Sequence, residues 1–427
     1  MQSKSRSGLA LQAAIAGALI STTASAVDFT SGDWKFSVDG NVNADYIYSS
    51  CQSAASAEPI VTVGGACTGS SSGSSVSNVG NGLLPAAITF GVSTTQAGYD
   101  ISAHFGLYPG ISTNDGGSPN LQVTPGAGSG LTNTALGTTG LDVRQVYLTF
   151  GNKDIGTFTF GRNFGLFGFD AIVNDMTLPG VGVAGAASTA APANTSLGSI
   201  GFGYIYTDTL AQMNYTTPDF AGFNATVGIF DPINSLTDSL AQGNALPKKA
   251  PGFHGKASYT AALPDDMKLY LSATFITQKQ DYQGTAGPVE YTGTGGDFFA
   301  KFDVGNFEFD GSYYQTKGLG TTGLFVLGDY QGSTRKSDGY LVQATYKFDA
   351  LKVGVNYGVS KLDFANAADA AATPNLLDKN SKVTGGLYYS LTKNLTLLGE
   401  VSSVKTQAHN GFENKSTDVN AGAYLSF

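Results

Sequence analysis

The residues best able to carry acid–base or nucleophilic chemistry in this chain are its three histidines, His104, His254 and His409. They fall on three separate predicted strands or loops, and no spacing suggests a Ser/His/Asp set. The glycine run from Gly156 to Arg162 opens no predicted helix, so it is not a phosphate cradle. The acidic positions lack the spacing of an EF-hand loop. The sequence therefore predicts a protein that is not an enzyme and that uses no cofactor and no metal.

Two cysteines, Cys51 and Cys67, are close together in a Ser/Ala/Gly-rich stretch. Neither has a neighbouring histidine or a second Cys-x-x-Cys pair, so a metal site is not favoured. The chain starts with two basic residues and an apolar run and then reads Ala24-Ser25-Ala26, which predicts a cleaved secretory signal over 1–26. In an oxidising compartment a Cys51–Cys67 disulfide is favoured, with two unpaired thiols as the alternative.

The stretch 35–48 shows which elements must position these residues. Its even positions, from Phe36 to Tyr48, are apolar or small, and its odd positions are polar or charged except for Ile47. A period of two over so many residues predicts a long strand with one apolar and one polar face. A soluble sandwich is the alternative, but its strands would be shorter, about 5–6 residues. The pattern favours a closed sheet whose apolar face meets lipid and whose polar face lines water.

The same alternation recurs to the last residue, so that residues 27–427 form one predicted barrel domain of sixteen antiparallel strands. Seven short turns and eight long loops alternate along the chain, as expected for a transmembrane β-barrel. The last strand ends on Phe427 and is expected to pair with the first. The turns are predicted near 95–98, 151–156, 217–222, 264–266, 305, 349–350 and 392–394, and the loops near 49–85, 109–140, 163–205, 231–251, 278–296, 317–336, 362–381 and 405–416.

Several motifs make the prediction more specific: Arg-Gln-Val-Tyr-Leu at 144–148, Gly-Thr-Phe-Thr-Phe-Gly-Arg-Asn-Phe-Gly at 156–165, Asn-Asp-Met-Thr-Leu-Pro-Gly at 174–180 and the segment 214–223. Together they resemble the general bacterial porins, the trimeric sixteen-stranded diffusion channels of Gram-negative outer membranes. The resemblance implies an inward-folded third loop over 163–205, a homotrimer, and contact with outer-membrane lipid and lipopolysaccharide. It also implies that the terminal Phe427 is read by the barrel-assembly machinery, and that the pore passes small hydrophilic solutes and ions.

By the same resemblance, an acidic third loop faces a basic wall across the pore constriction. Arg144 would be the wall arginine and Asp175 the loop carboxylate, with Asp170 as a second loop acid. Arg162 would sit at the root of the loop, where its planar fork could bind carbonyls or carboxylates. The sequence departs from the family where Gly180-Val181-Gly182 replaces a second acid after Pro179, and where Asp208 stands in place of a common arginine.

Strict alternation places Arg144 on the lipid face, whereas the resemblance places it in the lumen. Either a β-bulge resets the register, or Arg144 lies at the outer rim. Many other charged residues follow the polar face, and the simplest interpretation is that they set the polarity of the lumen: Asp39, Asp45, Asp100, Lys256, Lys301, Asp303, Asp310 and Glu400.

The net charge of the chain indicates which partners it can attract. Removal of the signal takes away two basic residues and no acid, so the formal net charge falls from −9 to −11. Such a chain is not expected to bind nucleic acid and attracts cations. With the basic wall thinned, the sequence predicts a cation-preferring diffusion pore. The alternatives are a channel selective for a sugar or an organic acid, a structural or adhesive barrel, and a secreted β-solenoid, which the lack of a short repeat disfavours.

Overall fold

The computed structural model describes residues 27–54, 59–67, 73–111, 141–184, 195–236, 244–284 and 287–427, so the predicted signal over 1–26 lies outside the described residues. Two six-residue helices occur there, α2 (Phe169–Asn174) and α3 (Ala367–Ala372). In this part of the chain, no helix is long and apolar enough to cross a membrane. Five short strands accompany the main sheet: β1 (Val27–Ser31), β3 (Ser75–Gly80), β10 (Asn244–Ala245), β15 (Asp329–Tyr330) and β16 (Ser333–Thr334).

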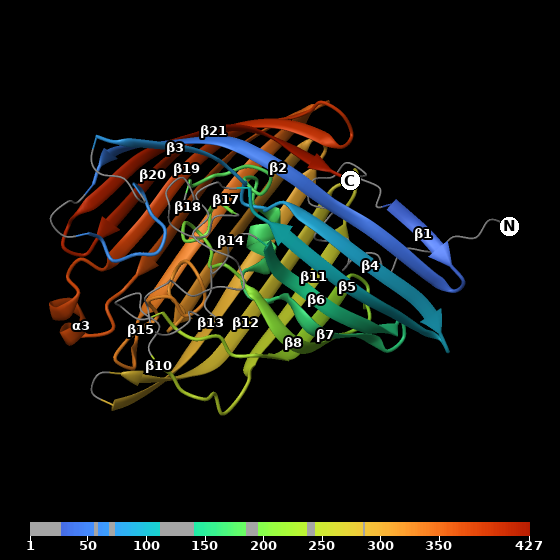
Figure 1. Cartoon of the computed structure of the whole chain (residues 1–427), viewed down its shortest axis with the longest axis horizontal. Coiled ribbons are helices and arrows are strands. Elements are labelled where there is room, and N and C mark those ends of the chain that lie inside the picture. Colours follow the sequence, from blue (N-terminus) through green and yellow to red (C-terminus); the bar gives the residue numbers. More distant parts are fainter. Residues whose placement is uncertain are drawn as a thin grey trace.

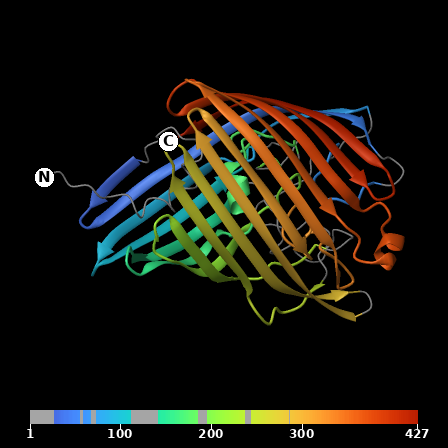
Figure 2. The ribbon, with the colours of Figure 1, turned by 180° about the vertical axis from the view of Figure 1, so that it is seen from behind.

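Sixteen long antiparallel strands form one closed barrel, which confirms the predicted architecture (Figure 1). Each strand pairs with the next one along the chain, and the ring of strands is seen from the other side in Figure 2. The strands are β2 (Trp34–Ser53), β4 (Ala87–Gln96), β5 (Tyr99–Pro109), β6 (Leu141–Asn152), β7 (Gly156–Phe164), β8 (Thr209–Thr216), β9 (Phe223–Phe230), β11 (Gly252–Ala262), β12 (Lys268–Gly284), β13 (Gly287–Val304), β14 (Phe307–Lys317), β17 (Lys336–Phe348), β18 (Leu351–Leu362), β19 (Leu377–Ser390), β20 (Leu395–Ala408) and β21 (Glu413–Ser426).

The barrel is closed by β2, which pairs with β4 along its first part and with β21 from Asn41 onward. Gly40 and Phe427 exchange two backbone hydrogen bonds of 3.0 Å, so the last residue of the chain is bound to the first barrel strand. A side chain at Gly40 would overlap the carbonyl oxygen of Ala87 on β4, so only glycine fits between the two neighbours. Closure leaves no unpaired edge among these strands, as a sheet in hydrocarbon requires.

The predicted alternation is present in β2. Val42 and Tyr46 are each 54% exposed, whereas Asn43 and Asp45 are at most 1% exposed. Ile47, the one apolar residue on the polar face, is fully buried and packs inside the barrel against Val181 and Ala184 of the third loop. The exception in the sequence therefore marks a place where the wall is covered by protein and not by water.

Outward-facing aromatic side chains cluster beside the short turns. Phe150 stacks on Phe158 with ring centroids 5.0 Å apart, next to the turn 153–155. Phe307 and Phe348 both lie against Tyr346 beside the turns that begin at Gly305 and Asp349. Aromatic rings prefer the boundary between hydrocarbon and head groups. These clusters therefore place one membrane surface at the rim that carries the short turns.

Two of the eight predicted long loops are wrong. Over 278–296, β12 and β13 stay paired from Gln278↔Gly293 to Gly284↔Gly287, with only residues 285–286 between them. Over 405–416, β20 and β21 pair as far as Gln407↔Glu413. Both hairpins carry polar residues on both faces, such as Lys279, which pairs with Glu290 at 2.7 Å. Without an apolar face there is no alternation in the sequence, so the strand extensions read as loops. The seven short turns are confirmed.

The sixth loop (318–335) and the seventh loop (363–376) are joined by a buried ion pair. Arg335 donates from Nε and Nη2 to the two carboxylate oxygens of Asp369, at 2.8 and 2.7 Å. Both side chains are 0% exposed. Asp369 also accepts hydrogen bonds from the N–H of Ala365 and the hydroxyl of Thr373, so its oxygens are well satisfied. This pairing fixes the sixth and seventh loops to each other at the long-loop rim.

We expect Asp369→Ala to release both loops from each other, because removal of one partner of a buried ion pair costs about 3–5 kcal/mol. Limited proteolysis of the folded protein in detergent should cut within 318–335 and 363–376, while the barrel stays intact. Asp363→Ala, at an exposed position of the same loop, is the control and should leave the wild-type pattern unchanged. Equal protection of both variants would contradict a stabilising role for the pair.

The same pair predicts how protection varies with pH. Burial alone would raise the pKa of Asp369, but hydrogen bonds from Arg335, Ala365 and Thr373 outweigh it and lower that pKa below the ordinary value of 3.8. The carboxylate therefore stabilises the loops above pH 3.8 and loses this effect as the pH falls through the lowered pKa. Protease protection should persist from neutral pH down to about pH 4 and disappear only in stronger acid.

Candidate pore constriction

The third loop runs from residue 165 to 208, since β7 ends at Phe164 and β8 begins at Thr209. It therefore starts two residues later and ends three residues later than the predicted span 163–205. Figure 1 shows α2 of this loop inside the ring of strands. Its backbone is hydrogen-bonded to inward-facing side chains of the wall. The N–H of Met176, for example, donates to Gln343 Oε1 on β17 at 2.9 Å, and the N–H of Gly203 donates to Ser360 on β18.

Three wall carboxylates bind backbone N–H groups of this loop. Glu400 on β20 accepts from Val181 and Gly182 at 2.8 Å each. Asp418 on β21 accepts from Ala184 at 3.0 Å, and Asp297 on β13 accepts from Gly168 at 2.6 Å. Hydrogen bonds to a charged acceptor are about twice as strong as neutral ones. Wall carboxylates are therefore major anchors of the loop.

Glycines make this docking sterically possible. A side chain at Gly180 would overlap the carboxylate of Glu400, and Gly182 has a φ of +57°, which disfavours other residues. Gly180-Val181-Gly182 stands where the family resemblance would place a second loop acid. In the structure the acid at this place comes from the wall, as Glu400, and the loop supplies the amides that bind it.

Lys382 on β19 lies among these anchors and is 1% exposed. Its Nζ donates to Thr384 at 3.2 Å, and its charge acts on the carboxylates of Asp175, Glu400 and Asp418. A buried carboxylate without a nearby cation is costly. Lys382 therefore offsets the negative charge that binds the third loop to this part of the wall.

The two acids predicted for the loop are buried in its contacts. Asp170 forms an ion pair of 2.6 Å with Lys256 on β11 and also accepts hydrogen bonds from Tyr270 and Ser272 on β12. Asp175 accepts from Thr177, from the N–H of Ser199 at 3.0 Å and from the hydroxyl of Tyr204 at 2.8 Å. Asp170 and Asp175 are 7% and 3% exposed, respectively. Asp170 binds the loop to the wall. Asp175 joins two parts of the loop and also accepts a hydrogen bond from Asn356 on β18 at 3.3 Å.

Arg144 faces the lumen, because a register shift resets the alternation of β6. In its pairing with β5, Gly106 is opposite Gln145 and Leu107 is opposite Val143, so Arg144 is the extra residue of a β-bulge. The residue is 7% exposed. Its Nε donates to Asp142 at 2.6 Å, and its guanidinium lies 5.4 Å from the ring centre of Tyr108. Of the two explanations open from the sequence, the bulge is confirmed.

Arg162 is not brought to the same place. It pairs in register with Val146 on β6 and Ala211 on β8, which are both exposed on the outer face of the barrel. The bulge at Arg144 explains the difference, because the two arginines lie on neighbouring strands but on opposite faces. Asp208 is 9% exposed and lies within reach of the charges of Arg144 and Arg162.

Asp208 is a predicted site residue whose pKa is raised. Burial raises the pKa of its carboxyl from 3.8 to about 6, although the N–H of Thr209 and the positive charges of Arg162 and Arg144 act in the opposite direction. The N–H of Thr209 donates to Asp208 Oδ1 at 2.6 Å. Asp208 is thus negatively charged at neutral pH and becomes neutral in mild acid.

Asp39 is a wall residue that sequence analysis placed on the polar face without assigning a site. Asp39 on β2 accepts a hydrogen bond from Thr89, and its charge acts on His104 and Tyr147. The rings of His104 and Tyr147 are 5.1 Å apart. Alternation alone placed Asp39 on the inner face, whereas the nearness of His104 and Tyr147 follows from the pairing of β2, β4, β5 and β6. Within the described ranges there is no cluster of His, Cys, Asp or Glu that could hold a metal ion.

The chain belongs to the Gram-negative porin family, whose model matches residues 10–409. A comparison with curated proteins finds no match. Among solved structures, the chain is similar to the outer membrane channel DcaP of Acinetobacter baumannii, with a TM-score of 0.66, 16% identity, and 93% of this chain and 99% of that chain covered. An anion-selective porin from Comamonas acidovorans gives a TM-score of 0.56 at 15% identity, with 92% and 100% covered. The trimer form of OmpT of Vibrio cholerae gives 0.51 at 12%, with 93% and 100% covered.

The family and the closed barrel together define an outer-membrane channel for diffusion in a Gram-negative bacterium. The structural likenesses establish the fold alone, because the identities are low. The pore of this chain has to be understood from its own side chains.

Gly180→Ala tests the docking of the third loop. The added methyl group should push the Glu400 carboxylate from the N–H groups of Val181 and Gly182, which removes hydrogen bonds worth about 1.5–3 kcal/mol each. Hydrogen exchange over 178–184 should become at least about tenfold faster. Gly385→Ala on β19 is the matched control, since a side chain there meets nothing within 4 Å and exchange should stay at the wild-type rate. Equal exchange in the two variants would argue against Glu400 as an anchor.

Asp208 predicts a pH-dependent pore. Because its pKa is raised to about 6, the carboxyl gains a proton as the pH falls below that value, and the arginines nearby then lose their negative neighbour. Acidification from neutral pH to about pH 5 should therefore reduce any preference for cations, as measured by reversal potentials in planar bilayers. In Asp208→Asn the same change in pH should have a smaller effect. An identical pH response in this variant and the wild type would exclude Asp208 as the titrating group.

Proposed function

We propose that this outer-membrane channel is a general diffusion pore for small hydrophilic solutes and ions, with a preference for cations. Sixteen strands enclose a lumen too wide to be filled by wall side chains. The third loop narrows this lumen on the side of β11–β21, and the inner faces of β2 and β4–β6 bound the remaining passage. Transport through such a passage is passive and needs no cofactor.

The observation that carries the proposed cation preference is the excess of acids on the inner surface. In the described strands the inward-facing carboxylates outnumber the inward-facing cations, and the third loop adds Asp170, Asp175 and Asp208 but no lysine or arginine. The strand residues are Asp39, Asp45, Asp100, Asp142, Asp297, Asp303, Glu308, Asp310, Glu400 and Asp418 against Lys35, Arg144, Lys256, Lys268, Lys301, Lys347, Lys352 and Lys382. A negative lining raises the local concentration of cations.

A preference for anions is the competing expectation, since one similar structure is described as an anion-selective porin. At 15% identity the likeness supports the fold and not the selectivity. The basic groups that could attract anions here are largely neutralised by acids: Arg144 by Asp142, Lys256 by Asp170 and Lys301 by Glu308. Arg144 and Lys256 are also well buried by their side-chain exposures of 9% and 15%.

We further propose that residues 1–26 are removed on export and that 27–427 is the barrel domain, embedded in outer-membrane lipid and lipopolysaccharide. A homotrimer is supported by the similar structure described as a trimer form. Phe427, bound to Gly40 at the seam, is the residue through which we expect the barrel-assembly machinery to act. A catalytic role is not part of the proposal.

Reversal potentials across a KCl gradient, recorded with the purified protein in planar bilayers, test the selectivity. The wild type should favour potassium, and Asp39→Asn should reduce the ratio of cation to anion permeability by about twofold, because one charge on the open wall is lost. Asp154→Asn, at an exposed turn, is the control and should leave the ratio unchanged. Chloride preference in the wild type would refute the proposal. Block of conductance by a sugar or an organic acid at micromolar concentration would favour the substrate-selective alternative.

A further inference from the structure

The described part of the first loop contains a segment, residues 59–67, that folds inward and lies above the third loop. We call it the strap. Ala66 and Cys67 are 3% and 6% exposed, and Ala66 belongs to the same apolar cluster as Leu197 of the third loop and Val404 of β20. A Cβ added to Gly64 would lie 2.6 Å from Leu197 Cδ1, so the strap is in close contact with the third loop.

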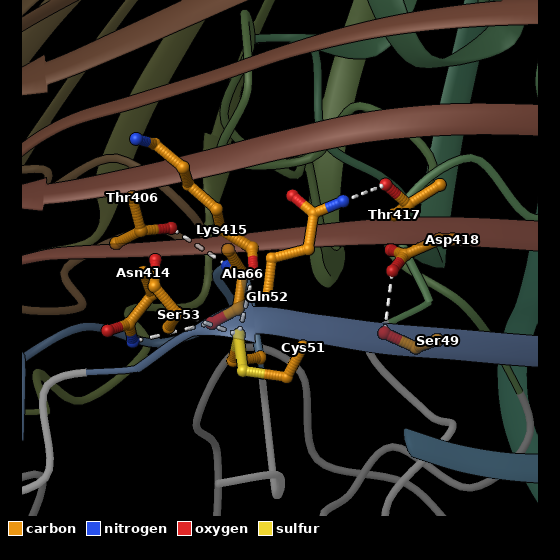
Figure 3. Close-up of a disulfide and its surroundings, with 11 residues drawn as sticks. Ser49, Cys51, Gln52, Ser53, Ala66, Thr406, Asn414, Lys415, Thr417 and Asp418 are labelled. Carbon is orange, nitrogen blue, oxygen red and sulfur yellow. Dashed lines mark hydrogen bonds between the residues drawn. A yellow bond between two sulfur atoms is a disulfide. The ribbon is translucent and has the colours of Figure 1, made fainter. Parts of the chain in front are cut away.

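One end of the strap is fixed by the predicted disulfide, which the structure confirms. Cys51 on β2 is bonded to Cys67, with an S–S distance of 2.03 Å. Figure 3 shows Ala66 beside this disulfide, with the side chains of Thr406 and Asn414 next to it. The N–H of Ala66 donates to Thr406 Oγ1 at 2.8 Å, and Thr406 is an inward-facing, fully buried residue of β20. The strap therefore enters the barrel from β2 and is held against the inner wall formed by β20.

The rest of the strap is bound by the sixth and seventh loops. The N–H of Val61 donates to the carbonyl oxygen of Asn375 at 3.0 Å, and the N–H of Leu377 donates back to Val61. The hydroxyl of Thr322 donates to the carbonyl oxygen of Val63 at 2.7 Å. Val61 and Val63 also pack on an apolar cluster of Val326, Leu327, Leu362 and Leu376.

These contacts place the strap across the mouth of the barrel, at a level different from that of the third loop. The same Thr322 whose hydroxyl binds the strap accepts, through its carbonyl oxygen, a hydrogen bond from the N–H of Tyr206 in the third loop. Strap, sixth loop and third loop are thus stacked in direct contact. A solute that approaches this part of the third loop from the long-loop rim meets the strap first.

We propose that the strap 59–67 is a second size-determining element of the pore, set above the third loop and kept in place by the Cys51–Cys67 disulfide. This inference rests on the proposed diffusion function. Polar contacts of the strap use backbone groups, so it limits the size of a solute and not its charge. Without the cross-link, the Cys67 end of the strap is no longer bonded to β2, and the strap can move out of the mouth.

The test uses the wild-type channel after it has inserted into a planar bilayer, so that folding is complete before the disulfide is cut. Reduction by a phosphine, which converts the disulfide to two thiols while the phosphine is oxidised to its oxide, should raise the single-channel conductance. We expect a rise of about 1.5-fold, since conductance follows the cross-section of the water-filled path. Cys51→Ala/Cys67→Ala should show the higher conductance from the start and no response to the phosphine.

A second variant displaces the strap with the disulfide intact. Gly64→Ala adds a methyl group against Leu197, whereas Gly73→Ala lies in the same loop, has a similar positive φ and meets nothing within 4 Å. Swelling of liposomes in sugars of increasing size should show a larger cut-off for Gly64→Ala and for the double cysteine variant, and the wild-type cut-off for Gly73→Ala.

Ion selectivity separates this inference from the proposed function. Reversal potentials should be the same in all these variants, because no charge is changed. The inference is overturned if the double cysteine variant and Gly64→Ala keep the wild-type conductance and size cut-off. Chloride preference, by contrast, would refute the proposed cation preference and leave the role of the strap to be judged by conductance and cut-off alone.

Discussion

A polypeptide in hydrocarbon has to pair all of its backbone N–H and C=O groups, and the rest of this structure depends on how the chain meets that constraint. The two backbone hydrogen bonds between Gly40 and Phe427 complete the ring of sixteen strands and remove both edges of the sheet. Closure with this number of strands creates a wide lumen that wall side chains cannot fill. The interior must then hold either water or additional polypeptide, and this chain uses both.

Polypeptide inside the lumen raises the same problem again, because its own amide groups need partners. Carboxylates of the wall supply these partners. Asp297, Glu400 and Asp418 accept hydrogen bonds from backbone N–H groups of the third loop, and glycines in the loop allow the close approach. Buried carboxylates repel one another, so a cation is required among them. Lys382 supplies this positive charge at the centre of the docking surface. The arrangement resembles the helix and strand ends of soluble proteins, where charged side chains satisfy free backbone groups.

The period-two pattern in the sequence was enough to predict the strands, their two faces and the closure of the barrel. The cysteine pair was predicted from the closeness of Cys51 and Cys67 and from the export signal, which are also local. The exception at Ile47 was visible too, but its partner Val181 was not. The partners of the third loop are far apart in sequence, 219 residues in the case of Val181 and Glu400, and no local pattern reports them. The bulge at Arg144 shifts the register by one residue, which alternation cannot foresee. Polar strand extensions, as around Lys279, lack the apolar face that would reveal them.

The acids that the family resemblance assigned to the electric field of the pore therefore serve first to hold the third loop in place. Asp170 and Asp175 are bound by Lys256, by hydroxyl groups and by backbone amides, which leaves little of either carboxylate open to passing ions. On the proposed function, the charge that acts on passing ions comes instead from other wall residues, such as Asp39 near His104. On the proposed function, selectivity therefore depends on the inward-facing charges that do not anchor the third loop. Two barrels of the same family can share every strand and still differ in the sign of this remaining net charge. Similarity of fold therefore does not predict selectivity.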